Sequence, residues 1–226
     1  MKLAHATWQP SGEGPWPTLF VLHGYGSNAL DLLSLAPHLC GGRLMVVAPQ
    51  GADQVSLGAP GSGAPIGHAW FPLGGTAPPN PLAVAGAVAD ARTFVEEAFT
   101  RLPADPARTA ILGFSQGGVI AYALALAAPA RWRGLAALST WLPDELAGAL
   151  PPADRSALET LVQHGTRDEM IGVERARSSV ERLRSLGVPV DAREYAMGHE
   201  VGARSLGELS EWLGERLLRR ETGARS

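Results

Sequence analysis

A serine stands between two glycines in the stretch AILGFSQGG, residues 110–118. Gly113 and Gly117 lie two positions either side of Ser115, which gives the pattern G-x-S-x-G. In this pattern the serine occupies a sharp turn with strained backbone angles, and the turn lifts its hydroxyl clear of a sheet edge. A side chain at either glycine position would crowd the turn. The pattern predicts a nucleophile at Ser115, and an ordinary glycine-containing turn is the alternative.

The flanking residues favour the nucleophile. The apolar run TAIL precedes the turn and predicts a strand, and GVIAYALALAA follows it and predicts a helix that starts with small residues. The amides at the start of that helix would point at the group that Ser115 attacks.

A serine nucleophile needs a base, and the base needs an orienting carboxylate. On a strand–turn–helix of this kind the acid and then the histidine follow the serine along the chain. His164 and His199 are the histidines that follow Ser115. His164 lies inside the strand-like run TLVQHG, ahead of the best acid, whereas His199 lies in YAMGHEVG between a predicted strand and the final helix. We therefore expect His199 to be the base.

The acid is expected three residues after the strand-like run TLVQHG. Asp168 lies there, in TRDEM, at the carboxyl end where sites of α/β proteins assemble. Asp191 starts a strand, and Asp144 and Asp154 fall in a proline-rich segment. The adjacent Glu169 is the competing carboxylate.

A tetrahedral intermediate also needs two amide donors. One is expected from Gln116, directly after the nucleophile, and the other from Tyr25 in LHGYGS, after the first buried strand. His23 precedes this loop, and we expect its ring to brace the loop rather than act as a base.

Short apolar runs alternate with helical patterns along the 226 residues. Buried strands of a parallel sheet are expected at 18–24, 44–51, 109–115, 135–140 and 160–165, and an edge strand at 190–196. Helices are expected at 28–39, 82–102, 117–128, 172–186 and 202–220. The alternation predicts an α/β fold with a mostly parallel, doubly wound sheet and helices on both faces. We expect one domain over residues 1–220, a frayed tail at 221–226 and no large cap domain.

Residues 55–81 form a dense Gly/Pro segment in which no element is expected. A loop of this length in a compact domain is functional or disordered. Because the segment contains Trp70 and Phe71, we expect it to fold over the top of the sheet and to wall a substrate pocket.

The composition and charge of the chain limit the kinds of partner that it is expected to bind. The net charge is −3, 18% of residues are charged and no basic patch stands out, which argues against nucleic acid. The single cysteine cannot form an internal disulfide, and no metal-ligand spacing of Cys and His is present. The N-terminal residues lack a secretory signal, and no apolar run approaches a membrane span. A cytoplasmic protein is expected, without a cofactor; a homodimer is left open.

Taken together, the motifs LHGYGSN, HAWFPL, GFSQGG, HGTRDEMI and MGHEV resemble the acyl-protein thioesterase and carboxylesterase family of small α/β-hydrolases. The resemblance spans residues 18–217 with the motifs in order. It implies an α/β-hydrolase fold, a Ser115–Asp168–His199 triad with the Tyr25 and Gln116 amides as oxyanion hole, and cofactor-free hydrolysis of acyl esters or thioesters through an acyl-enzyme.

The chain departs from the family around the acyl pocket. Pro72 follows the Trp–Phe pair where an aspartate is common, Tyr25 replaces a leucine, and EMIGV follows the acid where apolar residues usually lead to a proline. The expected function is therefore a carboxylesterase for short- to medium-chain acyl esters, with a protein thioesterase or lysophospholipase as alternatives on the same site. A non-catalytic binding domain of the same fold is the alternative from another class.

The substrate pocket is expected beside the motif loops. No Arg or Lys motif marks a carboxylate or phosphate on the substrate, which argues against a dienelactone-hydrolase-like activity. The expected pocket residues are Trp70, Phe71, Leu73, Trp141, Met170, Ile171 and Val201.

Overall fold

A computed structural model describes residues 1–56, 58, 66–73 and 79–219. The predicted tail at 221–226 lies outside the described residues. Within the described ranges, none of the helices combines the length and the apolar character that crossing a membrane requires.

Seven strands form one sheet in the order β1-β3-β2-β6-β7-β8-β9, and six of them run parallel. The exception is β1, which pairs antiparallel with β3 at the edge. The seven strands are β1 (His5–Trp8), β2 (Trp16–Leu22), β3 (Met45–Pro49), β6 (Ala104–Phe114), β7 (Gly134–Leu138), β8 (Thr160–Gly165) and β9 (Val190–Tyr195).

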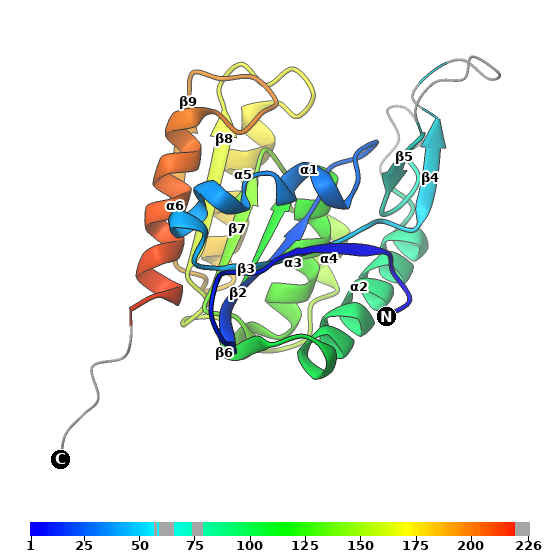
Figure 1. Cartoon of the computed structure of the whole chain (residues 1–226). Coiled ribbons are helices and arrows are strands. Elements are labelled where there is room, and N and C mark those ends of the chain that lie inside the picture. The colour runs from blue at the N-terminus through cyan, green and yellow to red at the C-terminus, as the bar shows by residue number, and fades with distance from the viewer. Residues whose placement is uncertain (57, 59–65, 74–78, 220–226) are drawn as a thin grey trace.

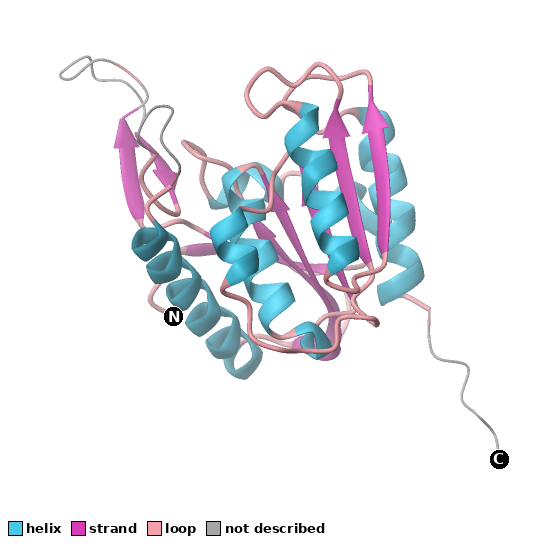
Figure 2. Ribbon diagram, turned by 180° about the vertical axis from the view of Figure 1, so that it is seen from behind, coloured by secondary structure: helices cyan, strands magenta, loops and turns pink. Residues whose placement is uncertain are grey.

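Helices cover both faces of this sheet, as the two opposite views in Figures 1 and 2 show. The helices are α1 (Ala29–Leu33), α2 (Pro81–Arg101), α3 (Gln116–Ala127), α4 (Asp144–Gly148), α5 (Val173–Ser185) and α6 (Ala203–Leu217), with 3₁₀ helices η1 (Ala36–Gly42) and η2 (Pro129–Arg131). The predicted doubly wound α/β fold is confirmed, and the described residues form no large cap.

Alternate residues of the central strands point into two separate cores. Phe20 of β2 and Ile111 of β6 pack with α2, α3 and α5 on one face. Leu19 and Leu112, from the same two strands, pack with α1 and α6 on the other. Because both faces are buried, these strands read as continuous apolar runs in the sequence.

Two sequence expectations need correction. The helix expected at 28–39 ends at Leu33, and a 3₁₀ segment that contains Pro37 replaces its second half, since proline cannot supply the amide that would continue the α-helix.

The segment 55–81 holds structure of its own, because β4 (Asp53–Ser56) and β5 (Ile66–Ala69) pair antiparallel in a second, two-stranded sheet. Figure 1 shows this ribbon projecting on the side of the molecule away from β9.

Candidate active site

Ser115 stands at the turn between β6 and α3, with φ 52° and ψ −122°. A Cβ on Gly113 would lie 2.4 Å from the Gly117 carbonyl oxygen, and a Cβ on Gly117 would lie 2.2 Å from that of Leu22. Both distances are far inside van der Waals contact, so only glycine fits at these positions. The turn is held by the Ser115 amide, which donates to Leu138 O at 3.0 Å, and by Thr140 Oγ1, which donates to Ser115 O at 2.7 Å. The Ser115 hydroxyl itself forms no hydrogen bond with the described residues.

Asp168 and His199 meet at the carboxyl edge of the sheet. Asp168 Oδ2 lies 2.7 Å from His199 Nδ1, and Oδ1 accepts the amides of Met170 at 2.9 Å and Ile171 at 2.8 Å. Asp168 is buried, so these donors fix the carboxylate in one orientation. Because a carboxylate oxygen accepts, the proton of a neutral His199 lies on Nδ1 and leaves Nε2 free to accept one.

The imidazole of His199 lies next to the nucleophile turn. Its ring centroid is 4.9 Å from that of Phe114, the residue before Ser115. The structure therefore brings the three predicted triad residues to one edge, from the ends of β6, β8 and β9. Catalytic hydrogen bonds are often loose until substrate binds, which fits a serine hydroxyl that has no partner in the described residues.

His164 is a second neighbour of the acid that sequence reasoning did not anticipate. Its Nε2 lies 3.4 Å from Asp168 Oδ2 and 2.7 Å from the carbonyl oxygen of Ile171. A carbonyl only accepts, so Nε2 carries the proton and donates. His164 is fully buried and contributes to holding the acid loop; it does not face the turn at Ser115 from an exposed loop as His199 does.

The loop after β2 packs directly on the nucleophile turn. A Cβ on Gly24 would lie 3.3 Å from Ser115 Cβ, so the glycine permits the close approach. In the part of the chain that is described, the amides of Tyr25 and Gln116 donate to no backbone carbonyl. The two amides predicted to form an oxyanion hole thus have no hydrogen-bond acceptor among the residues that the structure describes.

His23 braces this loop, as its sequence position suggests. Its Nε2 accepts the Gly51 amide at 3.0 Å, so Nδ1 carries the proton and donates to Gly24 O at 2.7 Å. The ring lies 5.3 Å from that of Trp70. Burial lowers the pKa of His23, although the hydrogen bond to Gly24 opposes the shift. A buried neutral imidazole with both nitrogens occupied cannot act as the base for Ser115.

The side chain of Gln116 has a role that the sequence did not reveal. Its Oε1 accepts the Trp70 amide at 2.9 Å, and its Nε2 donates to Phe71 O at 2.7 Å. It therefore ties the chain after β5 to the residue that follows the nucleophile. Trp70 and Phe71 are drawn into the core, with 5% and 0% of their surface exposed. The expectation that they wall the substrate pocket stays a prediction.

The other predicted pocket residues divide by exposure. Leu73 and Met170 are exposed, and Val201 is half-buried. Ile171 and Trp141 are buried beside the acid loop and after β7. Trp141 also lines a cavity of about 410 Å³ between the segment after β7 and helix α5.

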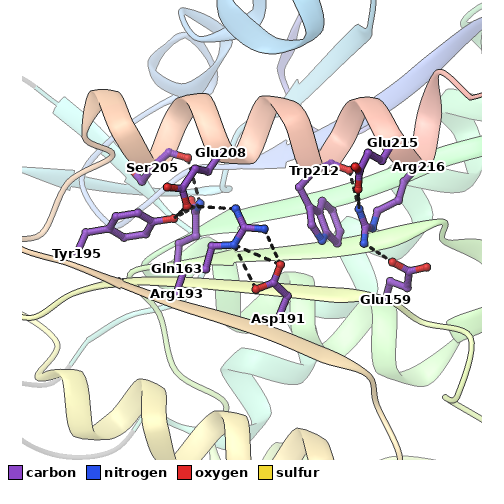
Figure 3. A network of polar contacts seen from close by, with 10 residues as sticks. All are labelled: Glu159, Gln163, Asp191, Arg193, Tyr195, Ser205, Glu208, Trp212, Glu215 and Arg216. Atoms are coloured by element: carbon purple, nitrogen blue, oxygen red, sulfur yellow. Dashed lines mark hydrogen bonds and ion pairs between the residues drawn. The ribbon is translucent and has the colours of Figure 1, made fainter.

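A polar network fixes the two ends of the loop that carries His199 (Figure 3). The Tyr195 hydroxyl, at the end of β9, donates to Glu208 of α6 at 2.8 Å and accepts from Gln163 Nε2 at 2.8 Å. Gln163 Nε2 also donates to Ser205 O at 3.0 Å, in the first turn of α6. Burial, followed by the hydrogen bond to Glu208, raises the pKa of Tyr195 to about 12, so its phenol stays protonated as a donor.

Among the described residues, no group of three or more His, Cys, Asp and Glu side chains could hold a metal ion.

Comparison with known proteins identifies related sequences and the family model that matches the chain. The sequence model of the Phospholipase/Carboxylesterase family matches residues 4–216. Acyl-protein thioesterase 1 of Gibberella zeae is 31% identical over 116 residues, which cover 50% of this chain and 49% of that protein. The chain thus spans about half the length of the curated relatives it matches first.

Solved structures agree on the fold. The crystal structure of esterase PE8 superposes with a TM-score of 0.81 at 24% identity, over 96% of this chain and 100% of that one. A carboxylesterase from Mesorhizobium loti superposes with a TM-score of 0.76 at 26% identity, over 89% and 90% of the two chains.

Proposed function

The chain belongs to the phospholipase/carboxylesterase family, and from that membership and the geometry of its site we propose that it is a serine carboxylesterase. The proposed reaction is hydrolysis of short- to medium-chain acyl esters through an acyl-enzyme on Ser115. The observation that carries this proposal is the 2.7 Å contact between Asp168 and His199, beside a strained serine turn.

The steps follow from these contacts. His199 Nε2 accepts the Ser115 proton as Oγ attacks the ester carbonyl, and Asp168 stabilises the imidazolium that results. The amides of Tyr25 and Gln116 stabilise the oxyanion, each by about 3 kcal/mol. His199 then protonates the departing alcohol. In the second half of the reaction it activates a water molecule, which releases the acid from Ser115.

Labelling by a fluorophosphonate probe tests the proposal, with wild type compared to Ser115→Ala. We expect labelling and hydrolysis of p-nitrophenyl butyrate by wild type and neither by the variant. Equal labelling of both proteins, or of neither, would rule out Ser115 as the nucleophile. Rates that rise steadily toward long-chain p-nitrophenyl esters would contradict the expected chain length.

A further inference from the structure

The cavity that Trp141 lines is linked along the chain to both the nucleophile turn and the acid loop. Thr140, which holds Ser115 O, is the residue before Trp141. On the other side, the Arg175 amide donates to Gly172 O at 2.9 Å, directly after the loop whose amides hold Asp168. The cavity, of about 410 Å³, is walled by α5, and Trp141 in its lining is joined along the chain to the residue that holds the nucleophile turn.

Helix α5 presents hydrogen-bond donors to this cavity at positions i, i+3 and i+7. These are Arg175, Ser178 and Arg182, which share one face of the helix. Arg182 is occupied, since it pairs with Asp144 and donates to Leu142 O at 2.8 Å. Arg175 and Ser178 have no side-chain hydrogen bond or ion pair with the described residues.

The guanidinium carbon of Arg175 lies over the ring of Trp141, 4.3 Å from the ring centroid. Burial of this group lowers the pKa of Arg175 from its usual value. A guanidinium is charged at any working pH, and that of the exposed Arg175 forms no ion pair with any of the described residues. An arginine stacked on an aromatic ring keeps its N–H groups in one plane for a bidentate contact with a carboxylate.

The acidic residues near the cavity do not supply that anion. Asp144 and Glu174 both line the cavity, but Asp144 pairs with Arg182 and Glu174 pairs with Arg177. Glu145 also lines the cavity and is exposed, and no ion pair joins it to Arg175 among the described residues. A carboxylate on a bound molecule would give Arg175 the partner that the chain does not provide.

Resting on the carboxylesterase function proposed above, we propose that Arg175 selects acyl groups that carry a carboxylate at their far end. The preferred substrates are then monoesters of dicarboxylic acids: the ester carbonyl lies at Ser115, and the free carboxylate binds Arg175 and Ser178. The sequence contains no motif for such a contact, because Arg175 and Trp141 meet only through the fold.

Three esters of equal chain length test the proposal. They are the p-nitrophenyl esters of adipic acid, which is anionic, of hexanoic acid, which is neutral, and of 6-(trimethylammonio)hexanoic acid, which is cationic. For wild type we expect kcat/KM to be highest for the adipate ester. In Arg175→Gln we expect the ratio of kcat/KM for adipate to that for hexanoate to fall about tenfold, which is about 1.4 kcal/mol. Salt at about 0.5 M should also lower this ratio in wild type, because it screens the attraction between the two charges.

Two variants make the comparison specific. Arg184→Gln removes an exposed arginine from the same helix that does not line the cavity and whose loss leaves no cavity carboxylate unpaired, so it should leave the ratio at its wild-type value. Arg175→Lys keeps the charge without the planar fork, and should retain part of the preference.

The proposal is overturned if the ratio is the same in wild type and Arg175→Gln, or if the cationic ester is the best substrate. Failure of the underlying carboxylesterase function looks different. In that case wild type hydrolyses none of the three esters and the fluorophosphonate probe does not label Ser115.

Discussion

The Gln116 side chain accepts a 2.9 Å hydrogen bond from the amide of Trp70, which lies 46 residues earlier in the chain. Through the same side chain it donates to Phe71 O. The residue proposed to supply an oxyanion amide thus also fastens the end of the β4–β5 ribbon to the nucleophile turn.

Replacing Gln116 with alanine should therefore destabilise the fold and disturb the site together. It leaves the buried Trp70 N–H and Phe71 C=O without partners, at about 1–3 kcal/mol each. We expect unfolding in urea to show a loss of about 2–4 kcal/mol, and kcat/KM to fall. Gln54→Ala, on the exposed face of β4, is the matched control and should change stability by no more than about 0.5 kcal/mol. Similar losses in the two variants would contradict this account.

Asp168→Asn should abolish most of the turnover while the fold persists. Met170 and Ile171 donate to Oδ1, so the asparagine oxygen takes that position and its NH₂ faces His199 Nδ1. Nδ1 must then accept, which places the ring proton on Nε2 and prevents it from taking the serine proton. We expect kcat to fall by about 10⁴.

Glu169→Gln is the control for this substitution and decides between the two carboxylates. Glu169 is exposed and makes no hydrogen bond or ion pair in the described chain, so its variant should keep kcat close to wild type. If Asp168→Asn kept near-normal kcat and Glu169→Gln lost it, Glu169 would be the acid.

The main strands and the candidate triad could be predicted from the sequence for a physical reason. Strands buried on both faces must be apolar throughout, and the chemistry of the triad fixes its residue types and their order along the chain. By contrast, the sequence did not predict β1. This strand has only four residues at the sheet edge, its residues are exposed or half-buried, and its segment HATW contains no apolar run.

What the sequence could not supply are contacts between distant segments. The bonds from Gln116 to the segment after β5 and the stacking of Arg175 on Trp141 join residues that no local pattern relates. Trp70 and Phe71 were expected to be covered because their exposure to water would be costly, but the backbone bonds to Gln116 that hold them in the core could not be predicted.

His23 should make stability depend on pH. Its pKa in the folded protein lies below the ordinary value of 6.5, mainly because it is buried, so the unfolded chain takes up the proton more readily. The stability that this neutral imidazole contributes is complete above about pH 6.5 and is lost as the pH falls below it. We expect the difference in unfolding free energy between wild type and His23→Gln to be constant above about pH 7 and to shrink toward pH 5.

Urea unfolding at a series of pH values measures these free energies, and His38→Gln is the reference variant because His38 is exposed. Its curve should run parallel to that of wild type. A His23→Gln curve that also ran parallel would show that the buried ring does not contribute to the acid sensitivity.

Gly117→Ala should be far more damaging than an alanine placed where a helix has room. The added Cβ would lie 2.2 Å from Leu22 O and 2.5 Å from His23 O, both of them backbone atoms at the start of the proposed oxyanion loop. Either that loop moves away from Ser115 or the turn does, so we expect a loss of about 3 kcal/mol or more in stability and little esterase activity. At Gly86 in α2 an added Cβ meets no atom within 4 Å, and Gly86→Ala should stabilise the protein by about 0.5–1 kcal/mol. Thermal melts of the two variants should therefore shift in opposite directions from wild type, and a Gly117→Ala protein with wild-type Tm and rate would show that the turn does not have the geometry described.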